Sequence, residues 1–583
     1  MANPDPTPFL GVTASVTGRR WIGPGIEQQR LADSILQMTG LPLPVAQCLA
    51  RRRIGPEAVE DYLSPKLKTL LPDPRSLRDM EKAAERLRQA VAESQRIAIF
   101  ADYDVDGGSS AALLLRWLRG LGRNATLYIP DRIDEGYGPN VPAMQDLSAR
   151  HDLIICVDCG TVSHAPLAAA SCDVLVLDHH LAEAQLPPAF AVVNPNRTDE
   201  SGDLGHLCAA AVVFLLLVEA NRQNRAAGQP CPDLMGLLDL VALATVADVA
   251  PLIGVNRAFV TQGLTVMARR HNPGLVALAD CARLDRAPAA YHLGFVFGPR
   301  INAGGRVGKA DLGARLLATD SPEEAAGLAA RLEELNTERR EIEAQVRDAA
   351  LAQIETRGSE GALVWACGED WHPGVVGIVA SRVKEATGRP AVIIGLVEGE
   401  GKGSGRSVAG IDLGACVQKV AQEGLLLKGG GHRMAAGLSV DPEKIEPAMD
   451  RLEALLAEQG ADRLGPADLV LEAAIAPAAA TEELVTTLDQ AGPFGPSSPA
   501  PRLALSGLRI KFLRRVGETH LKLSLTDGHA TVEAICFGAF DGPLGPFFET
   551  CGDARLHVAG RLDLNHWQGR VSVQLQVEDA ALA

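Results

Sequence analysis

The sequence lacks an excess of positive charge. Its 583 residues include 56 Lys plus Arg against 72 Asp plus Glu, which gives a formal net charge of -16. Proteins that hold nucleic acid by general electrostatic attraction are basic, so this composition argues against that class. Any contact with nucleic acid must therefore depend on local groups.

The sequence also lacks a hydrophobic run that could span a bilayer, which takes about 20 residues. The longest apolar run, 207–218, stops at Glu219 and predicts a buried helix. The first residues, MANPDPTPFLGV, contain neither the basic nor the apolar region of a secretory signal. We therefore expect a cytoplasmic protein with no membrane partner.

Cysteine is present without the spacing of a disulfide framework. The 11 cysteines are scattered through the chain, which favours reduced thiols. Cys156 and Cys159 form a CxxC pair, but a redox or zinc site would need a helix N-terminus or a second pair, so we expect core thiols. With 47% hydrophobic and 22% charged residues, the composition is that of a globular protein, and the length predicts about three to five domains.

From Arg96 onward, apolar strands alternate with a helical pattern. RIAIFADYDVDG predicts a strand and an acidic loop, SSAALLLRWLRGLG a helix, and ATLYIPDR a second strand. DLIICVDCGT and DVLVLDHH continue the rhythm as two short strands that end in polar residues. The pattern is typical of an α/β domain with a parallel sheet, in which ligands bind at the carboxyl ends of the strands.

A long polar helix is expected to follow. Ser321 can cap it, Pro322 fits its first position, and Glu324 completes a capping box, so the helix should run to about Glu355 and connect two domains. Beyond it the pattern predicts a second α/β unit and then about five alternating strands, as in a small β-barrel. The expected segments are an N-terminal extension (1–75), an α/β domain (76–318), the connector helix (319–357), a second α/β domain (358–460) and the barrel (461–583).

Acidic and imidazole side chains follow three of the predicted strands. In chain order they are Asp102, Asp104, Asp106, Asp158, Asp178, His179 and His180. Alternate acids in a turn can aim their carboxylates at one point, and adjacent histidines at a strand end should point to opposite sides, one to metal and one to substrate. Carboxylates with imidazole suit Mn²⁺, and Mg²⁺ less well.

Two alternatives bear on this cluster. DxDxDG also resembles the start of a calcium loop, but no acid stands six residues after its glycine, and the expected helix follows the loop rather than precedes it. Asp248 lies in the apolar segment ATVADVAPL, where a metal would supply the partner that a buried carboxylate needs. Asp239 lies nearby in a similar helix, so which of the two completes the set stays open. Together such groups can hold one or two divalent ions for phosphodiester hydrolysis.

Several of these segments resemble a known family. ADYDVDG, VDCGT and LDHH, in that order, resemble motifs of the DHH phosphoesterase superfamily, and GGGHRMAAG resembles the signature of its companion domain, DHHA1. GPRINAGGRVGKA, DWHPGVVGIVASRVKE and the terminal barrel are similar to the superfamily's bacterial exonucleases that act on single-stranded DNA. The resemblance implies a DHH domain at 76–318, a DHHA1 domain at 358–460 and an OB-fold single-strand-binding domain at 461–583.

The resemblance also implies roles for the acidic and imidazole residues. His180 would lie at the scissile phosphate, supported by Asp102 and Asp178. Other branches of the superfamily carry a metal-binding His where this chain has Phe100, so the number of bound Mn²⁺ or Mg²⁺ ions, one or two, stays open. The implied metal ligands are Asp104, Asp106, Asp158, His179 and Asp248.

Polar side chains beside glycines are candidates for DNA contacts, because free backbone N–H groups and Arg forks can cradle phosphates. The resemblance places them along the DNA path and makes Ser404 and Arg406 the first choices for a pocket that reads a 5′-phosphate. The full set is Arg132, Arg300, Arg306, Ser404, Arg406 and His432.

The C-terminal region, residues 501–583, has no net charge. Residues 501–583 hold nine Lys plus Arg and nine Asp plus Glu, so the first 500 residues carry the whole net charge of -16. One predicted strand clusters basic residues, and a later one has His566 and Trp567, as an OB-fold would use for backbone charge and base stacking. The expected contacts are Arg509, Lys511, Arg514, Arg515 and Trp567.

The acidic and imidazole cluster favours metal-dependent phosphodiester hydrolysis, and the resemblance implies an exonuclease that degrades single-stranded DNA from 5′ to 3′. A nanoRNase or cyclic-dinucleotide phosphodiesterase is disfavoured by Phe100 and by the added barrel, and a non-catalytic replication scaffold is disfavoured by the intact acids. The resemblance implies work in DNA recombination and repair, with single-strand-binding protein and a RecQ-type helicase as partners. We expect the chain to act as a monomer.

Overall fold

The computed structural model describes residues 7–131, 135–358, 360–463, 465–567 and 570–583. The chain forms two compact units. The larger unit consists of Pro72–Ala250 and Phe259–Gly465, and the barrel unit consists of Met1–Leu71, Pro251–Ala258 and Pro466–Ala583. None of the helices in the described ranges combines the length and the apolar character needed to cross a membrane.

The first sheet of the larger unit has five parallel strands in the order β3-β2-β4-β5-β6. Every residue of β2 and β4 is buried, as expected for parallel strands covered on both faces. The strands are β2 (Ile97–Ala101), β3 (Ala125–Tyr128), β4 (Leu153–Val157), β5 (Asp173–Leu177) and β6 (Ala191–Val193).

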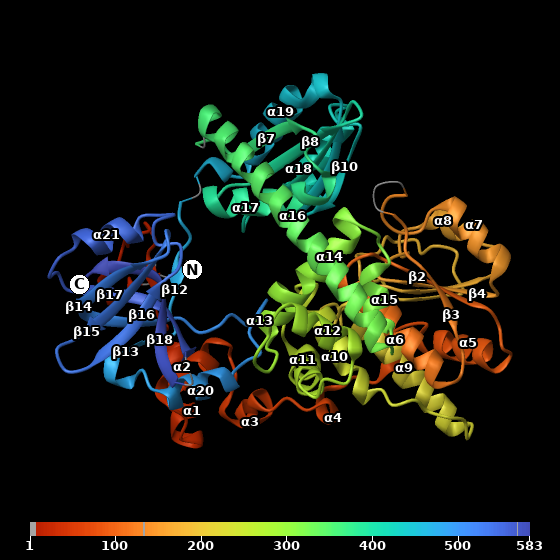
Figure 1. Ribbon diagram of the computed structural model, residues 1–583, viewed down its shortest axis with the longest axis horizontal. Helices are drawn as coiled ribbons and strands as arrows, with labels where there is room; N and C mark the ends of the chain where they lie inside the picture. Colours follow the sequence, from red (N-terminus) through yellow and green to blue (C-terminus); the bar gives the residue numbers. More distant parts are fainter. Residues whose placement is uncertain (1–6, 132–134, 359, 464, 568–569) are drawn as a thin grey trace. The chain divides into compact units, whose positions relative to one another are not determined.

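Helices cover both faces of this sheet (Figure 1). The face that includes Phe100 and Cys156 packs against α7 and α8, and Cys159 is buried in the same cluster. All 11 cysteines are free, so the prediction of reduced core thiols at Cys156 and Cys159 is confirmed. The surrounding helices are α5 (Met80–Ala92), α6 (Val105–Gly120), α7 (Val141–Arg150), α8 (His164–Ala168) and α9 (Ala209–Ala226).

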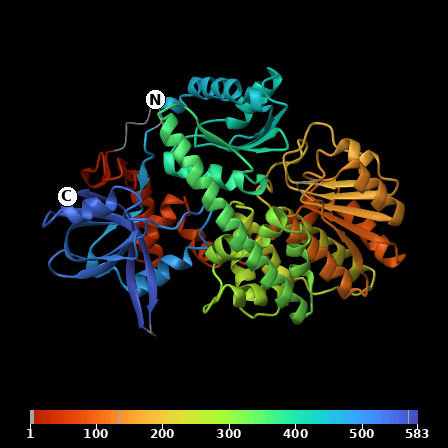
Figure 2. The same ribbon diagram turned by 45° about the horizontal axis from the view of Figure 1, so that its top comes forward.

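A group of helices leads from this sheet to a second one, and the long green helix α16 (Pro322–Arg357) is its most extended member (Figure 2). Ser321 caps α16 by accepting a hydrogen bond from the Glu324 N–H at 3.2 Å. The predicted capping box is only half right, because Thr319 Oγ1 accepts the Ser321 N–H and the Glu324 carboxylate bonds to Thr319 and Arg315. The preceding elements are α10 (Leu238–Ala247), α11 (Gly254–Met267), α12 (Pro273–Cys281), α13 (Ala290–His292), the π-helical turn η5 (Leu293–Phe297), α14 (Gly298–Val307) and α15 (Leu312–Ala318).

The second sheet of the larger unit is mixed, in the order β10-β11-β9-β8-β7. Only β7 and β8 are parallel to each other; the other pairs are antiparallel. Its elements are β7 (Val364–Glu369), α17 (Pro373–Thr387), β8 (Ala391–Val397), β9 (Glu400–Arg406), α18 (Leu413–Gln422), β10 (Lys428–His432), β11 (Ala435–Val440) and α19 (Ile445–Glu458).

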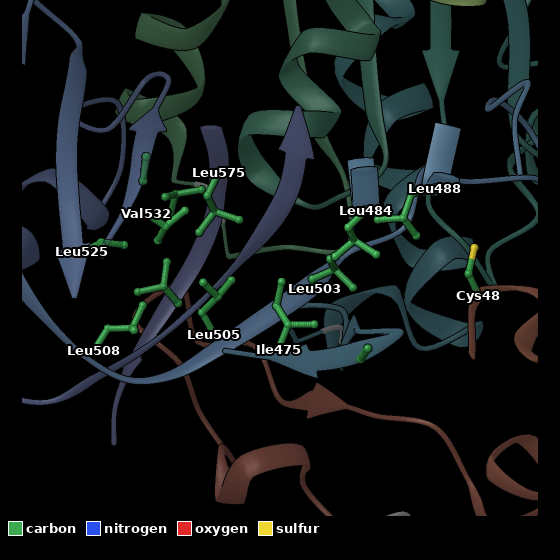
Figure 3. Packing of buried hydrophobic residues seen from close by; sticks show 14 of the residues in the cluster. Cys48, Ile475, Leu484, Leu488, Leu503, Leu505, Leu508, Leu525, Val532 and Leu575 are labelled. Carbon is green, nitrogen blue, oxygen red and sulfur yellow. The ribbon is translucent and has the colours of Figure 1, made fainter. Parts of the chain in front are cut away.

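The sheet of the barrel unit closes on itself. Its strands are ordered β13-β14-β15-β16-β18-β17, and β14 also pairs with β17. The interior is filled by leucines such as Leu503, Leu505 and Leu575, drawn in Figure 3. The fold prediction of a parallel-sheet α/β domain, a long helix, a second α/β domain and a C-terminal OB-fold barrel is confirmed. The strands are β13 (Ala473–Ile475), β14 (Leu503–Val516), β15 (His520–Thr526), β16 (Thr531–Cys536), β17 (Leu556–Trp567) and β18 (Arg570–Leu582).

The N-terminal segment is part of the barrel unit. Strand β1 (Trp21–Ile22) pairs in parallel with β12 (Leu469–Val470), and the buried Trp21 Nε1 donates a hydrogen bond to Asp579 Oδ2 at 2.9 Å. Cys48 of α2 belongs to the same buried cluster as the barrel leucines and lies at the side of the barrel, beyond Leu484 and Leu488 (Figure 3). The helices of this unit include α1 (Ile26–Thr39), α2 (Leu43–Arg51), α3 (Val59–Leu63), α4 (Leu67–Leu70), α20 (Glu482–Gln490) and α21 (Leu544–Thr550).

The sequence predicts free backbone N–H groups in the glycine-containing segments, as in loops, but the described segments form regular structure. GPRINAGGR lies in α14, GKGSGR in β9 and GGGH in β10. In α14 the glycine permits close packing, because a Cβ on Gly305 would lie 2.3 Å from the Tyr103 ring. In β9, Ser404 pairs with residues of both neighbouring strands. Glycine in these segments therefore serves close approach within regular structure rather than a free loop.

Candidate metal centre and substrate site

The strand register of the first sheet brings the acidic motifs together. Ala101 is paired with Val157, and Val157 with Leu177, so the next residues, Asp102, Asp158 and Asp178, follow three adjacent strands at one edge. All three carboxylates are buried. The parallel sheet therefore concentrates negative charge at its carboxyl edge, where ligands bind in folds of this kind.

Two further acids stand at the start of α6. Asp104 is the N-cap, and its Oδ1 accepts hydrogen bonds from the N–H groups of Asp106 and Gly107 at 2.9 and 3.1 Å. Asp106 is inside the first turn of the helix and accepts the backbone N–H groups of Ala209 and Ala210 at 2.6 and 2.8 Å. The sequence predicts that the alternate acids share one turn. This is wrong for Asp106, which lies inside α6. Asp106 is instead oriented by the first N–H groups of α9.

His179 is surrounded by three carboxylates. Its Nε2 lies 3.2 Å from Asp158 Oδ1 and 3.7 Å from Asp106 Oδ2, and its Nδ1 lies 3.8 Å from Asp248 Oδ2. Asp248 caps the C-terminus of α10. Four side chains from four separate segments therefore converge on one point.

His180 lies beside His179, with ring centroids 4.7 Å apart. The expectation that the two rings point to opposite sides is wrong, because β5 ends at Leu177 and the alternation of side chains ends with it. His180 Nδ1 is 2.8 Å from Asp178 Oδ1, which also accepts the backbone N–H of His179. The carboxylate of Asp178 therefore orients His180.

The pKa values in this cluster reflect crowded negative charge. Burial and the neighbouring acids, Asp106 first, raise the pKa of Asp158 well above its usual value and that of Asp248 to about 9. Asp178 behaves differently. Burial opposes its ionisation, but hydrogen bonds from His180 and Thr161 hold its pKa below the usual value. For His180, burial is outweighed by the Asp178 hydrogen bond, which raises its pKa to about 9.

The donor set fits a divalent cation. Asp158 Oδ1 is buried and has no hydrogen-bond partner among the described residues, although a buried carboxylate oxygen normally has one. Ligand atoms within 4.8 Å of one another form three groups that could each hold an ion. Carboxylates with one or two imidazoles suit Mn²⁺, and carboxylates alone suit Mg²⁺. The groups are Asp158 with His179 and His180, Asp106 with His179 and Asp248, and Asp102 with Asp104 and Asp158.

The geometry distinguishes Asp248 from Asp239. Asp248 faces the histidine cluster, whereas Asp239, one helix length earlier in α10, is buried against a separate cavity of about 350 Å³. Asp239 Oδ1 accepts the Leu240 N–H at 2.8 Å, and burial raises the pKa of this carboxyl to about 6. Of the two, Asp248 is the candidate ligand.

Other residues of this site did not stand out in the sequence. The hydroxyl of Tyr137 donates to the Asp158 carbonyl oxygen at 3.1 Å and lies 3.3 Å from His180 Nε2. Asn194 follows β6 and donates to the His180 carbonyl oxygen at 2.8 Å and to Thr161 Oγ1 at 2.9 Å. A polar residue directly after a strand is the signal that marked the acids, and it also marks Asn194. Nothing comparable marks Tyr137.

Some DNA-contact candidates line a cavity of about 460 Å³ in the larger unit. Arg306 reaches it from α14 and donates to the Gly374 carbonyl oxygen at 3.1 Å, and Ser404 reaches it from β9. The cavity is also lined by Lys402 and Lys428, which the sequence had not singled out. Arg406 donates to Ser404 Oγ at 2.9 Å. The cavity is therefore basic, with a hydroxyl at its wall.

The remaining candidates of this group have different surroundings. Arg300 pairs with Glu333 of α16 and donates to the Val296 carbonyl oxygen at 2.8 Å, so its charge is already compensated. His432 ends β10 and is exposed. Arg132 lies outside the described residues.

The basic strand of the barrel is β14. All four basic side chains, those of Arg509, Lys511, Arg514 and Arg515, are exposed. Arg515 makes two 2.7 Å hydrogen bonds to Glu549 and stacks on the Phe540 ring, 4.0 Å from its centroid. Arg515 therefore has a structural partner that the other three lack among the interactions recorded for the described residues.

Two aromatic rings of the barrel are exposed and were missed in the sequence. Phe512, between the basic residues of β14, is 52% exposed, and Phe537, after β16, is 58% exposed. A single apolar residue in an alternating strand gives no signal that it faces solvent. Trp567, which the sequence predicts to stack on bases, ends β17, but its side chain lies outside the described part of the structure.

Comparisons with known families cover three segments of the chain. Residues 96–245 match the DHH family N-terminal domain, residues 359–458 the DHHA1 domain, and residues 471–579 the RecJ OB domain. The chain is 36% identical over 527 residues to the single-stranded-DNA-specific exonuclease RecJ of Escherichia coli K12, covering 87% of this chain and 90% of that protein. The relative of the same name from Dickeya dadantii is 37% identical over 529 residues, with 87% and 91% coverage.

Solved structures of proteins with the same name are also similar to this chain. The crystal structure of RecJ with Mn²⁺ from Thermus thermophilus matches with a TM-score of 0.80 and 31% identity, over 96% of this chain and 79% of that one. The corresponding structure with Mg²⁺ matches with a TM-score of 0.74 and 29% identity, over 97% and 78%.

Proposed function

The chain belongs to the RecJ family of single-stranded-DNA-specific exonucleases, and we propose that it removes nucleotides from the 5′ end of single-stranded DNA. The observation that supports this most directly is the position of His179 among the carboxylates of Asp106, Asp158 and Asp248. In this proposal these residues and Asp104 hold one or two Mn²⁺ or Mg²⁺ ions. Asp158 Oδ1, which faces His179 Nε2 at 3.2 Å but has no hydrogen-bond partner among the described residues, is a ligand atom. When bound, such ions supply positive charge that neutralises a phosphodiester and activates water.

His180 is proposed as the residue that contacts the scissile phosphate. Its Nδ1 lies 2.8 Å from Asp178 Oδ1, which orients the ring so that a ring N–H can be offered to a phosphate oxygen. Asp178 holds Nδ1, which leaves Nε2 for the substrate. The hydroxyl of Tyr137, 3.3 Å from that nitrogen, limits the orientations of the ring. Asp102, buried at the same sheet edge, adds negative charge that favours cation binding.

The basic cavity is proposed as the site of the 5′-phosphate. Arg306 and Ser404 line it with Lys402 and Lys428, and Arg406 bonds to Ser404. A terminal phosphate carries more negative charge than a bridging one, so a cavity with several cationic groups would select the 5′ end and set the polarity. Among the other candidates, His432 is proposed to contact the DNA strand. Arg300 is proposed to have mainly a structural role, through its ion pair with Glu333.

The test of the function is degradation of single-stranded DNA that carries a label at either end. With Mn²⁺, release from the 5′ end is expected, Asp106→Ala should abolish it, and a blunt duplex should resist. Cleavage confined to dinucleotides would reject the proposal in favour of a nanoRNase or cyclic-dinucleotide phosphodiesterase, and no cleavage by the metal-loaded protein would favour a scaffold. In the active enzyme, Arg406→Ala should remove the preference for a 5′-phosphate over a 5′-hydroxyl.

The wider role is also a proposal. On the basis of the family relationship, we propose domain limits at 76–318, 358–460 and 461–583. The same relationship supports a role in recombination and repair and a cytoplasmic location. Single-strand-binding protein and a RecQ-type helicase are the proposed protein partners, and the active form is proposed to be a monomer.

A further inference from the structure

Two aromatic residues of the larger unit are stacked on each other and exposed to solvent. Tyr291 of α13 and Phe295 of η5 are 63% and 69% exposed, and their ring centroids lie 4.9 Å apart with an interplanar angle of 22°. Phe297, two residues further on, is completely buried. Large apolar rings are normally buried, so a parallel pair that is held outward indicates a contact surface.

This aromatic pair lies on a helical run that adjoins the candidate metal centre. In η5, a Cβ on Gly294 would lie 3.4 Å from Val246 Cγ1, so η5 packs on the end of α10 that leads to Asp248. In α14, Gly305 packs against Tyr103, which stands between Asp102 and Asp104. The run that carries the pair thus contacts two of the segments that supply candidate ligands.

The local backbone and charge also fit a ligand contact. Between α13 and α14 the helix opens into the π-helical turn η5, and single turns of this type occur frequently at functional sites. The exposed Arg286 lies close enough to His292, next to Tyr291, to lower the pKa of that imidazole, in addition to the larger effect of burial. An exposed cation therefore stands in the segment that leads into α13.

We propose that Tyr291 and Phe295 form a stacking platform for a base of the single-stranded substrate, at the border of the hydrolytic site. Flat rings stack on any nucleobase, because every base has a π-face, and Arg286 would meet the neighbouring backbone phosphate. Bases of an intact duplex are stacked within the helix and cannot occupy the platform, so it contributes to single-strand selectivity. This inference rests on the proposed function, because the occupant is the substrate of that site.

The test measures binding separately from hydrolysis. In the full-length Asp106→Asn protein with Mn²⁺, affinity for a 5′-phosphorylated oligodeoxythymidine is compared with and without Tyr291→Ala and Phe295→Ala. The double substitution should weaken binding about tenfold, the range expected for loss of one stacked base. Tyr291→Phe with Phe295→Trp should restore it. Met235→Ala is the control, because Met235 is 51% exposed and precedes the opposite end of α10.

A second substrate separates stacking from a general loss of structure. Strands whose bases are replaced by abasic residues should bind the platform variant and its parent equally. Equal affinity of the two proteins for the normal strand would overturn the platform. Nuclease activity is measured in the protein that retains Asp106. Its absence would reject the proposed function, and the binding comparison would still decide the role of the two rings.

Discussion

His179 Nε2 lies 3.2 Å from Asp158 Oδ1, across the edge between β5 and β4. This pair joins two separate motifs, because the strands that carry them are parallel neighbours whose last residues are in register. The same ring lies within 4 Å of Asp106 and Asp248, so the candidate metal centre is assembled around one imidazole. Metal binding should therefore be sensitive to each of the segments that meet there.

Replacing Asp248 should impair metal binding, and replacing Asp239 should not. Both acids lie in or next to α10, but only Asp248 faces His179. Asp248→Asn is expected to weaken Mn²⁺ binding by about 10-fold or more, by analogy with the loss of a charged partner at a buried site. Isothermal titration with Mn²⁺ measures this directly. If Asp239→Asn weakens binding equally, the assignment of Asp248 is wrong.

Gly107→Ala should disrupt the site, whereas Gly108→Ala should be tolerated. A Cβ on Gly107 would lie 2.4 Å from the Asp102 carbonyl oxygen, which would force α6 away from the acidic strand end. The nearest atoms to a Cβ on Gly108 lie at 3.5 Å, an ordinary contact, and alanine in a helix is favoured over glycine by about 1 kcal/mol. Nuclease assays should therefore show a loss of at least tenfold for Gly107→Ala alone. Comparable activities for both variants would contradict the packing.

Stability should depend on pH through Asp239. Burial raises its folded-state pKa to about 6 from an ordinary 3.8, so its contribution to stability is fully present below pH 3.8 and is lost as pH rises through 6. Asp239→Asn removes this loss and should raise the free energy of unfolding at pH 8 by up to about 3 kcal/mol. Calorimetry at pH 5 and pH 8 should show that the free energy of unfolding of the variant exceeds that of the parent by more at pH 8 than at pH 5. A constant difference would exclude titration of Asp239 as the cause.

In the barrel, Arg514 and Arg515 should behave differently although they are neighbours. Both side chains are exposed, but Arg515 is held by Glu549 and Phe540. For Arg514→Ala, the slope of log Kobs against log salt should fall by about 0.7, the value for loss of one phosphate contact on a single strand. Arg515→Ala should lower the melting temperature and leave the slope nearly unchanged. If salt titrations show the same change of slope for Arg514→Ala and Arg515→Ala, the two arginines do not differ in their contact with DNA.

Much of the fold could be predicted because its signals are local. Buried strands that end in acids, the Ser321-Pro322 start of α16 and the alternating strands of the barrel are each encoded within a few residues. Local signals failed where a residue finds its partner outside the short motif that predicted it. The carboxylate of Glu324 bonds to Thr319 and Arg315 rather than to its own N-cap, and the glycines of α14 and β9 serve packing against other elements.

By itself, the sequence determined the chemistry of the site, because the motif residues and their order along a parallel sheet place carboxylates and imidazoles at one edge. Only the tertiary structure decided which side chains meet. It turned Asp248 and not Asp239 toward His179, added Tyr137 and Asn194 around His180, and set Tyr291 and Phe295 outward. It also joined Trp21 to Asp579 within the barrel unit. The contacts of His179, His180 and Trp21 join residues far apart in the sequence, and the packing that selects them leaves no periodic trace in the residues that make them.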